Sequence, residues 1–195
     1  MNHFFQQIES ALLPTAIKYA PEGSEPKAVV HQWIHAIACG NKPFAAQRGA
    51  SKAKLIGIMK KENLYEDEES FKNKLPKTPI KPAKESTFTF IDLFAGIGGM
   101  RIGFQKAGGT CVFSSEFEKN AQATYCENHG DHPFGDITKI SVEDIPDHDV
   151  LVAGFPCQPF SHAGLKKGID DTRGTLFHNI ANILNGKKSQ IGCVL

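Results

Sequence analysis

The spacing of hydrophobic residues in the first 75 positions is that of α-helices. Apolar side chains recur every three or four residues over 4–12 and again over 29–37, a repeat that places them on one face of a helix. Pro14 is expected to end the first run, Gly40 to end the second, and Ser51 to cap a third helix. The pattern predicts a small helical module of three or four helices in residues 1–75.

Trp33, His31 and His35 all fall within the second of these runs. Trp33 is interpreted as a core residue of the module rather than as a platform for a nucleic-acid base. Two histidines four residues apart on one helix face can bind a metal ion, but no third ligand stands nearby. The spacing therefore favours a pair of surface histidines.

The pattern changes between residues 76 and 87, where prolines and lysines accumulate. Proline fixes φ and removes a backbone donor, so this stretch predicts an extended linker. After it, short apolar runs typical of buried strands alternate with helical stretches, which predicts an α/β fold with a parallel, doubly wound sheet. The expected strands cover 87–94, 110–115, 149–153 and 191–195, and the expected helices cover 100–107, 117–128 and 174–184.

Composition limits the class of protein. Of the 195 residues, 41% are hydrophobic and 22% are charged, as in an ordinary soluble globular protein. There is no apolar run of the ~18 residues that a membrane helix needs, and no secretory signal pattern. Five cysteines without a C-x-x-C pair indicate neither a disulfide framework nor a zinc site, and favour the reducing cytoplasm. Residues 1–85 hold 13 Lys and Arg against 9 Asp and Glu, an excess that suits a solvated surface better than a phosphate-binding stripe.

A glycine-rich turn, Phe94-Ala95-Gly96-Ile97-Gly98-Gly99, follows the first expected strand. Glycines at this place let a ligand approach the backbone and leave N–H groups free at the start of a helix. Arg101 stands where a dinucleotide-binding motif would carry its third glycine, which argues against a dinucleotide site. A tight turn that binds nothing is the alternative.

Acidic residues with apolar neighbours follow this turn along the chain. Glu116 ends the second expected strand, 17 residues after Gly99, where nucleotide-binding sheets place the carboxylate that holds a ribose. Phe117 beside it could lie against an adenine ring. Asp136 could accept a hydrogen bond from an adenine amino group, with Ile137 packing on the ring. On spacing alone, a surface carboxylate at Glu116 and a simple turn at Asp136 are equally good interpretations.

Cys157 lies in the stretch Gly154-Phe155-Pro156-Cys157-Gln158-Pro159-Phe160-Ser161, directly after the third expected strand. Ligands of open α/β sheets bind outside the carboxyl ends of the strands. A packed core strand would not carry these prolines, so the cysteine is placed for nucleophilic attack rather than for packing. A thiol hydrolase with His162 as its base is the nearest rival, but it gives the glycine turn and Glu116 no role.

Residues 92–99 and 154–161 resemble the first and fourth motifs of the cytosine-C5 DNA methyltransferases, in the order and spacing of that family. Glu116, Gly135-Asp136-Ile137 and Arg173-Gly174-Thr175-Leu176-Phe177 agree with the family too. The resemblance covers residues 88–195 and implies part of a Rossmann-like, S-adenosylmethionine-dependent methyltransferase sheet. It also implies methyl transfer from S-adenosylmethionine to C5 of cytosine in double-stranded DNA, within a restriction-modification system, with Cys157 as the nucleophile.

The resemblance further implies roles for individual residues. Those implied to bind S-adenosylmethionine are Phe94, Ala95, Gly96, Gly98, Gly99, Glu116, Phe117, Asp136, Ile137, Pro156 and Leu176. Gln158, Ser161 and Arg173 are implied to contact DNA, and no metal is expected. Phe117 stands where the family often has tryptophan, which leaves a smaller ring to stack on adenine.

The sequence stops before the Glu-Asn-Val motif with which the family holds the flipped cytosine, and before its target-recognition domain. The expectation is a fragment of a longer enzyme, inactive alone, or one subunit of a split methyltransferase completed by a second polypeptide. A third interpretation is an inert remnant whose helical module binds DNA or a partner. The sequence specifies neither the DNA target nor a role for residues 1–75.

Overall fold

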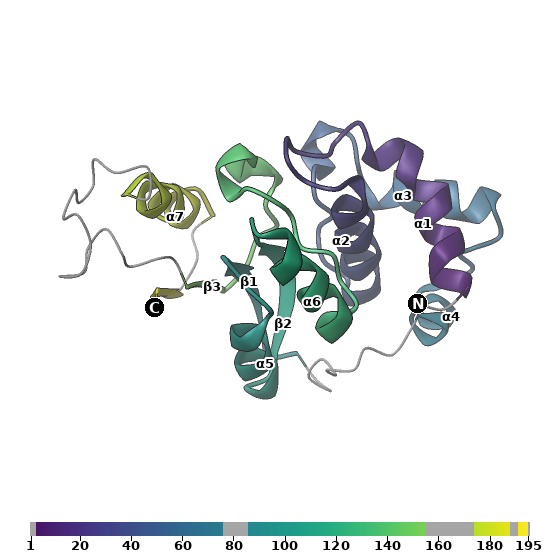
Figure 1. The fold of residues 1–195 in the computed structure, drawn as a ribbon. Coiled ribbons are helices and arrows are strands. Elements are labelled where there is room, and N and C mark those ends of the chain that lie inside the picture. The colour runs from purple at the N-terminus through teal and green to yellow at the C-terminus, as the bar shows by residue number, and fades with distance from the viewer. Residues whose placement is uncertain (1–2, 76–85, 155–173, 188–190, 195) are drawn as a thin grey trace.

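The computed structural model describes residues 3–75, 86–154, 174–187 and 191–194, to which all structural statements below refer (Figure 1). Four described strands form a sheet in the order β2-β1-β3-β4, and each neighbouring pair is parallel. The strands are β1 (Phe88–Leu93), β2 (Gly109–Ser115), β3 (Val150–Ala153) and β4 (Ile191–Val194). The parallel α/β sheet expected from the sequence pattern is confirmed.

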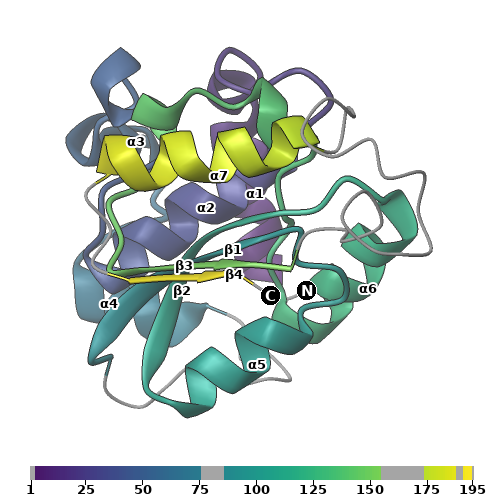
Figure 2. The same ribbon diagram turned by 90° about the vertical axis from the view of Figure 1, so that its left-hand side faces the viewer.

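Helices cover both faces of this sheet. α5 (Gly99–Lys106) follows β1 and lies below the sheet in Figure 2, with α6 (Lys119–His129) following β2. α7 (Gly174–Lys187) lies above the opposite face, where it contacts two single turns, η2 (Ile137–Lys139) and η3 (Val142–Asp144). Helices on both faces are what a doubly wound sheet requires.

The strands supply side chains to two hydrophobic layers. Phe90, Cys111 and Val152 form a cluster with Phe104 of α5. The other face of the sheet joins a larger cluster, which includes Val112 and Phe113 of β2. Both of these consecutive residues reach the larger cluster because the register between β1 and β2 shifts between Phe90 and Ile91, an irregularity of the β-bulge kind.

The N-terminal helices pack against the sheet and share this larger cluster. They are α1 (His3–Ala16), α2 (Pro26–Cys39), α3 (Lys52–Lys61) and α4 (Glu68–Lys74), with a single turn η1 (Ala46–Arg48) between α2 and α3. α2 contacts β2. Trp33 of α2 is fully buried, as expected, and its indole N–H donates to the Phe44 carbonyl at 2.8 Å. One hydrophobic core therefore spans the helical segment and one face of the sheet.

Two helix boundaries follow the sequence signals and one does not. Gly40 ends α2 in the left-handed conformation, with φ 74°. Ser51 caps α3 by accepting a hydrogen bond from the Lys54 N–H. Pro14, however, lies inside α1, which continues to Ala16. Proline removes only its own N–H from the helical pattern, so the apolar face can persist for the last turn, and Ala16 is buried.

The prediction of a surface histidine pair in α2 is wrong. His31 is 3% exposed and lies between the Glu9 carboxylate and the backbone N–H of His132. His35 is half-buried and bonds to the Cys111 carbonyl of β2. The helix face that carries them is polar because it meets backbone groups of the sheet part, not because it meets water.

Several expectations fall on residues outside the described ranges. They include most of the linker assigned to 76–87 and the polar stretch from His162 to Arg173. No helix within the described ranges combines the length and the hydropathy needed to cross a membrane.

Candidate functional site

The sheet topology defines where a ligand would bind. β1 has β2 on one side and β3 on the other, so the chain reverses its direction of winding between β1 and β3. Such a switch point opens a crevice at the carboxyl ends of the strands. Leu93 at the end of β1 is paired with Ala153 at the end of β3. The glycine turn and Gly154 therefore follow neighbouring strands at the same edge of the sheet.

The glycine turn is held in an unusual backbone conformation. Phe94, Gly96 and Gly98 all have positive φ, at 55°, 55° and 87°. For Phe94, which has a Cβ, the left-handed region costs about 1–2 kcal/mol. The Ala95 N–H donates to the Ser115 carbonyl at 3.0 Å, and the Gly98 N–H to the Ala95 carbonyl at 2.9 Å. Strain of this kind persists where the surroundings impose it, often at binding sites.

Glu116 joins the end of β2 to this turn. One carboxylate oxygen accepts a hydrogen bond from the Gly96 N–H at 2.7 Å, and the other accepts from the Glu118 N–H at 2.7 Å. Gln122 of α6 donates to the Glu116 carbonyl at 2.5 Å, which fixes the backbone as well. A carboxylate offers about four acceptor positions, so Glu116 keeps capacity for hydroxyl donors from a ligand.

Two side chains at the end of α6 form hydrogen bonds to backbone carbonyls of the glycine turn. Asn128 donates to the Ile97 carbonyl at 3.0 Å, and His129 Nε2 donates to the Gly98 carbonyl at 3.1 Å. Burial lowers the pKa of His129 to about 4, assisted by the charge of Arg101, so its ring is neutral. The ring sits so close that a Cβ on Gly98 would lie 2.1 Å from His129 Nε2. Only glycine fits this position.

Asp92 is a candidate site residue that the sequence analysis did not single out. It is 1% exposed at the end of β1, and neither carboxylate oxygen has a hydrogen-bond partner among the described residues. Burial raises its pKa to about 7; Arg101 opposes this shift and Glu116 adds to it. A buried carboxyl without a partner is expensive and is typical of functional sites. Its signal in the sequence is an acidic residue within an otherwise apolar strand.

The remaining expected cofactor residues that the structure describes differ in how far their side chains are exposed. Phe117 is 75% exposed, so its ring is free to meet a ligand. The Asp136 carboxylate caps η2 by accepting from the N–H and hydroxyl of Thr138, and it is half-buried. Ile137 is only 5% exposed and belongs to the hydrophobic core. Leu176 is half-buried in the first turn of α7.

Five of the expected site residues lie outside the described ranges, namely Pro156, Cys157, Gln158, Ser161 and Arg173. The described elements on either side of this stretch are a strand and a helix. β3 ends at Ala153, next to β1, and α7 begins at Gly174.

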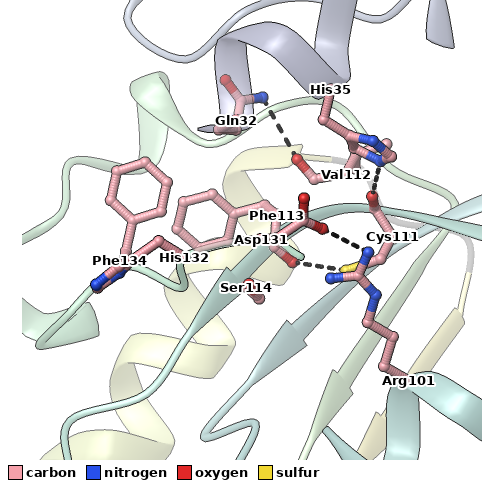
Figure 3. A pocket seen from close by; sticks show the side chains of 10 residues that line it. All are labelled: Gln32, His35, Arg101, Cys111, Val112, Phe113, Ser114, Asp131, His132 and Phe134. Carbon is pink, nitrogen blue, oxygen red and sulfur yellow. Dashed lines mark hydrogen bonds and ion pairs between the residues drawn. The ribbon is translucent and has the colours of Figure 1, made fainter. Parts of the chain in front are cut away.

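Arg101 stands where a dinucleotide motif would carry its third glycine, and its side chain is buried. Its guanidinium forms an ion pair with Asp131 at 2.5 Å (Figure 3). It also donates to the Tyr125 hydroxyl of α6 at 2.9 Å. Burial would raise the pKa of Asp131, but the adjacent guanidinium holds it below its ordinary value.

Comparison with known proteins shows which family the chain belongs to. Residues 88–191, more than half of the chain, match the C-5 cytosine-specific DNA methylase family. The chain belongs to that family. The matched part contains the glycine turn, Glu116, Asp136 and Cys157.

Curated relatives of the family agree over the same share of the chain. The Type II methyltransferase M.SsoII of Shigella sonnei is 59% identical over 115 residues, which are 58% of this chain and 30% of that protein. The Type II methyltransferase M.HhaI of Haemophilus parahaemolyticus is 50% identical over 112 residues, 57% of this chain and 34% of that protein. The chain thus spans about a third of the length of these methylases. Among solved structures, the Dnmt2 methyltransferase of S. pombe is 28% identical, with a TM-score of 0.43 over 53% of this chain and 34% of that one.

Proposed function

We propose that this chain supplies the methyl-donor site and the nucleophile of a DNA (cytosine-5-)-methyltransferase of a restriction-modification system. The proposal is supported by family membership and by the Type II methyltransferases to which the chain is similar. The observation that carries it is the bond between the Glu116 carboxylate and the Gly96 N–H at the switch point of the sheet. This bond places a carboxylate that can accept hydrogen bonds from a ribose next to the glycine turn, at one edge of the crevice.

The described residues fit S-adenosylmethionine as the cofactor. Glu116 has acceptor capacity left for ribose hydroxyls. The ring of Phe117 is exposed beside it and can lie against an adenine. The strained turn 94–99 exposes Gly99 at the start of α5 and Ile97, which is 57% exposed. Asp136 keeps an oxygen free for an adenine amino group, whereas Ile137 would contribute backbone rather than side-chain contact.

Cys157 is proposed to make cytosine reactive. C5 of an aromatic cytosine is a poor nucleophile. Attack of the Cys157 thiolate on C6 breaks the aromatic system and places an electron pair at C5. When bound, S-adenosylmethionine supplies an electrophilic methyl group for C5. Departure of the C5 proton and of the thiolate then restores the ring. The base must leave the duplex stack for this attack, which makes double-stranded DNA with a flipped cytosine the proposed substrate.

The cofactor site is tested by titrating the chain with S-adenosylhomocysteine in a calorimeter. Hydrogen bonds to a charged group are worth ~1.5–3 kcal/mol, so Glu116→Gln should weaken binding by roughly 10- to 100-fold. Glu127→Gln, an exposed carboxylate on α6, is the matched control and should bind as the wild type does. Equal affinities of the two variants would remove Glu116 from the site.

The nucleophile is tested in a chimera in which residues 88–191 replace the matching segment of M.HhaI. A duplex containing 5-fluorocytosine cannot lose its C5 substituent as a proton, so the covalent adduct accumulates. We expect the adduct to form and to vanish in Cys157→Ser. A chimera that binds S-adenosylhomocysteine but forms no adduct, or an adduct that survives Cys157→Ser, contradicts the assignment.

The length comparison adds a partner to the proposal. The chain spans about a third of the methylases that it matches. The functions carried by the rest of those proteins would have to come from polypeptide beyond residues 88–191, either covalently continuous with this segment or in a second chain. Mixing experiments with the remaining part of M.HhaI, scored by methylation of plasmid DNA, distinguish the two arrangements.

A further inference from the structure

The segment from His132 to Lys139 carries Asp136 and is built onto the end of β2. The Phe134 N–H donates to the Ser114 carbonyl at 2.9 Å, and the Glu116 N–H donates to the Phe134 carbonyl at 2.8 Å. These bonds form an isolated parallel bridge between Ser115 and Phe134. The sheet thereby fixes one side of the segment, directly beside the carboxylate of Glu116.

The other side of this segment is held by the turn between α1 and α2. The Gly135 N–H, next to Asp136, donates to the Ser24 hydroxyl at 2.9 Å. Gly23 lies so near that a Cβ on Gly135 would be 2.3 Å from its carbonyl oxygen. Two backbones in such close contact leave little freedom for the residues on either side. Lys139, the last residue of η2, adds a looser ion pair to Glu22 of the same turn, at 3.8 Å.

A second hydrogen-bonded contact lies three residues earlier. The His132 N–H donates to Nδ1 of His31 at 2.9 Å, so the His31 proton is on Nε2, which faces the Glu9 carboxylate at 3.2 Å. This hydrogen bond, with that of Lys27, holds the pKa of Glu9 at about 2 against the effect of burial. Glu9 therefore stays charged and orients the His31 ring over the whole neutral range.

Aromatic packing closes the same junction. The Phe134 ring stacks on Phe113 of β2, with centroids 4.8 Å apart, and lies 4.7 Å from the ring of Phe44 in the N-terminal segment. Phe134 is 1% exposed and Phe44 is fully buried. The segment before Asp136 is therefore enclosed between the sheet and the helical part.

α2 also completes the outer edge of β2 (Figure 3). Gln32 donates to the Val112 carbonyl at 3.4 Å, and His35 donates to the Cys111 carbonyl at 2.5 Å. Within the described sheet β2 is an edge strand, and unpaired edge groups need partners when they are buried. The helical segment thus supplies donors to β2 at Cys111 and Val112, and the bridge of Phe134 follows at Ser115.

We propose that the N-terminal helical segment, residues 3–75, is a structural part of the cofactor site, and that Ser24 is a positioning residue for the adenine-binding turn at Asp136. This inference rests on the proposed function for its ligand. Ser24 touches no ligand itself. It fixes the Gly135 amide, and with it the direction in which the Asp136 carboxylate leaves the chain.

The proposal is tested with Ser24→Ala, using Ser10→Ala, an exposed serine of α1, as the matched control. Hydrogen exchange of the peptide 132–139 reports on the contact without any ligand. One neutral hydrogen bond corresponds to about a five-fold change in an equilibrium, so exchange of this peptide should rise by about that factor in Ser24→Ala only. Ser24→Thr keeps the accepting oxygen and should restore the wild-type rate.

The ligand measurement is a calorimetric titration of the same variants with S-adenosylhomocysteine. Because a turn that has lost this bond must be ordered when the ligand binds, Kd should rise about two- to five-fold in Ser24→Ala and return in Ser24→Thr. Unchanged exchange of 132–139 overturns the proposal, and so does raised exchange with unchanged affinity. Raised exchange throughout β1 and β2 would show a general loosening and would overturn the local role of Ser24. If the wild-type chain binds no S-adenosylhomocysteine, the proposed function fails, and the exchange result alone decides whether Ser24 holds the turn.

Discussion

A methyl group added at Gly98 should destabilise the fold more than one added anywhere else in the glycine turn. Gly98 has φ 87°, and its ideal Cβ would lie 2.1 Å from His129 Nε2 and 3.0 Å from a ring carbon of Tyr125. His129 is 1% exposed and Tyr125 is fully buried. The His129 ring cannot retreat without giving up its hydrogen bond to the Gly98 carbonyl.

Two effects set the size of the loss in Gly98→Ala. A residue with a Cβ pays about 1–2 kcal/mol in the left-handed region. Extra volume in a well-packed interior costs about 1–3 kcal/mol more. The expected loss in the free energy of unfolding is therefore about 2–5 kcal/mol, a large part of the ~5–15 kcal/mol that a domain of this kind has available.

Two neighbouring glycines separate these effects. Gly96 has φ 55° but open space around its Cβ position, so Gly96→Ala should cost only the conformational part, about 1–2 kcal/mol. Gly99 has neither a positive φ nor a neighbour within 4 Å, and it begins α5. Gly99→Ala should be neutral or stabilising by up to ~1 kcal/mol, because alanine favours the helix.

Urea unfolding at 25 °C, followed by the fluorescence of Trp33, measures all three variants. Trp33 is the only tryptophan in the sequence and is fully buried in the core that the helices share with the sheet, so it reports on that core. A loss in Gly98→Ala no larger than in Gly96→Ala would refute the close approach of His129. An equal loss in Gly99→Ala would show that the turn is sensitive to any methyl group, and would refute the argument from φ.

Three further perturbations have defined outcomes. Burial raises the pKa of Asp92 to about 7, so the folded chain keeps a proton that the unfolded chain releases above its ordinary pKa of 3.8. Relative to Asp92→Asn, the free energy of unfolding of the wild type should therefore fall between pH 4 and 7 by up to ~1.4 kcal/mol per pH unit. Urea midpoints of the two proteins that run parallel across that range would contradict this. Partial burial acts to raise the pKa of the Cys39 thiol, but His35, one turn earlier, lowers this pKa overall, whereas burial raises the pKa of Cys111 to about 12. Because the Cys39 side chain also reaches solvent, iodoacetamide should label it at least about tenfold faster than Cys111 at pH 7.5, as measured by peptide mass spectrometry. Equal labelling rates would be inconsistent with this environment. The Arg48 guanidinium forms a bidentate ion pair with Asp144, whose side chain is 4% exposed. Arg48→Ala should therefore lower the free energy of unfolding by about 1–2 kcal/mol in urea titrations. A change below ~0.3 kcal/mol would mean that water replaces the pair.

The strands and the glycine turn could be predicted because their signals are local. Residues 88–93 and 150–153 are short, mostly apolar runs bounded by turn residues. Such runs are typical of the strands of a parallel sheet whose two faces are both covered by helices. Glu116 was expected near the glycine turn because the carboxyl ends of parallel strands share one edge. Its bond to Gly96 could not be predicted, because it depends on the positive φ values that the turn adopts in three dimensions.

Ile137 and Asp92 show what the sequence does not reveal about single residues. Ile137 stands beside Asp136 in the sequence, which suggested one shared ligand. The structure turns the isoleucine into the core, since consecutive residues in a single turn point in different directions. Asp92 is the first residue of the motif at 92–99, but its place in an apolar strand gave it no separate role in the sequence. Its burial, and the absence of a partner among the described residues, make it a candidate site residue.

The docking of the N-terminal helices shows a more general limit. Ser24 and Gly135 are 111 residues apart in sequence, and His35 and Cys111 are 76 apart. In each pair one partner is a backbone group, and backbone groups leave no trace in the sequence. A usable signal does exist, because Gln32 and His35 interrupt an apolar helix stripe at a spacing of three and both bond to β2. Polar donors that interrupt a buried stripe in this way indicate that the helix lies against the edge of a sheet, whose carbonyls need donors. The mildly basic composition of this part pointed to its solvent-facing side and said nothing about the face that packs.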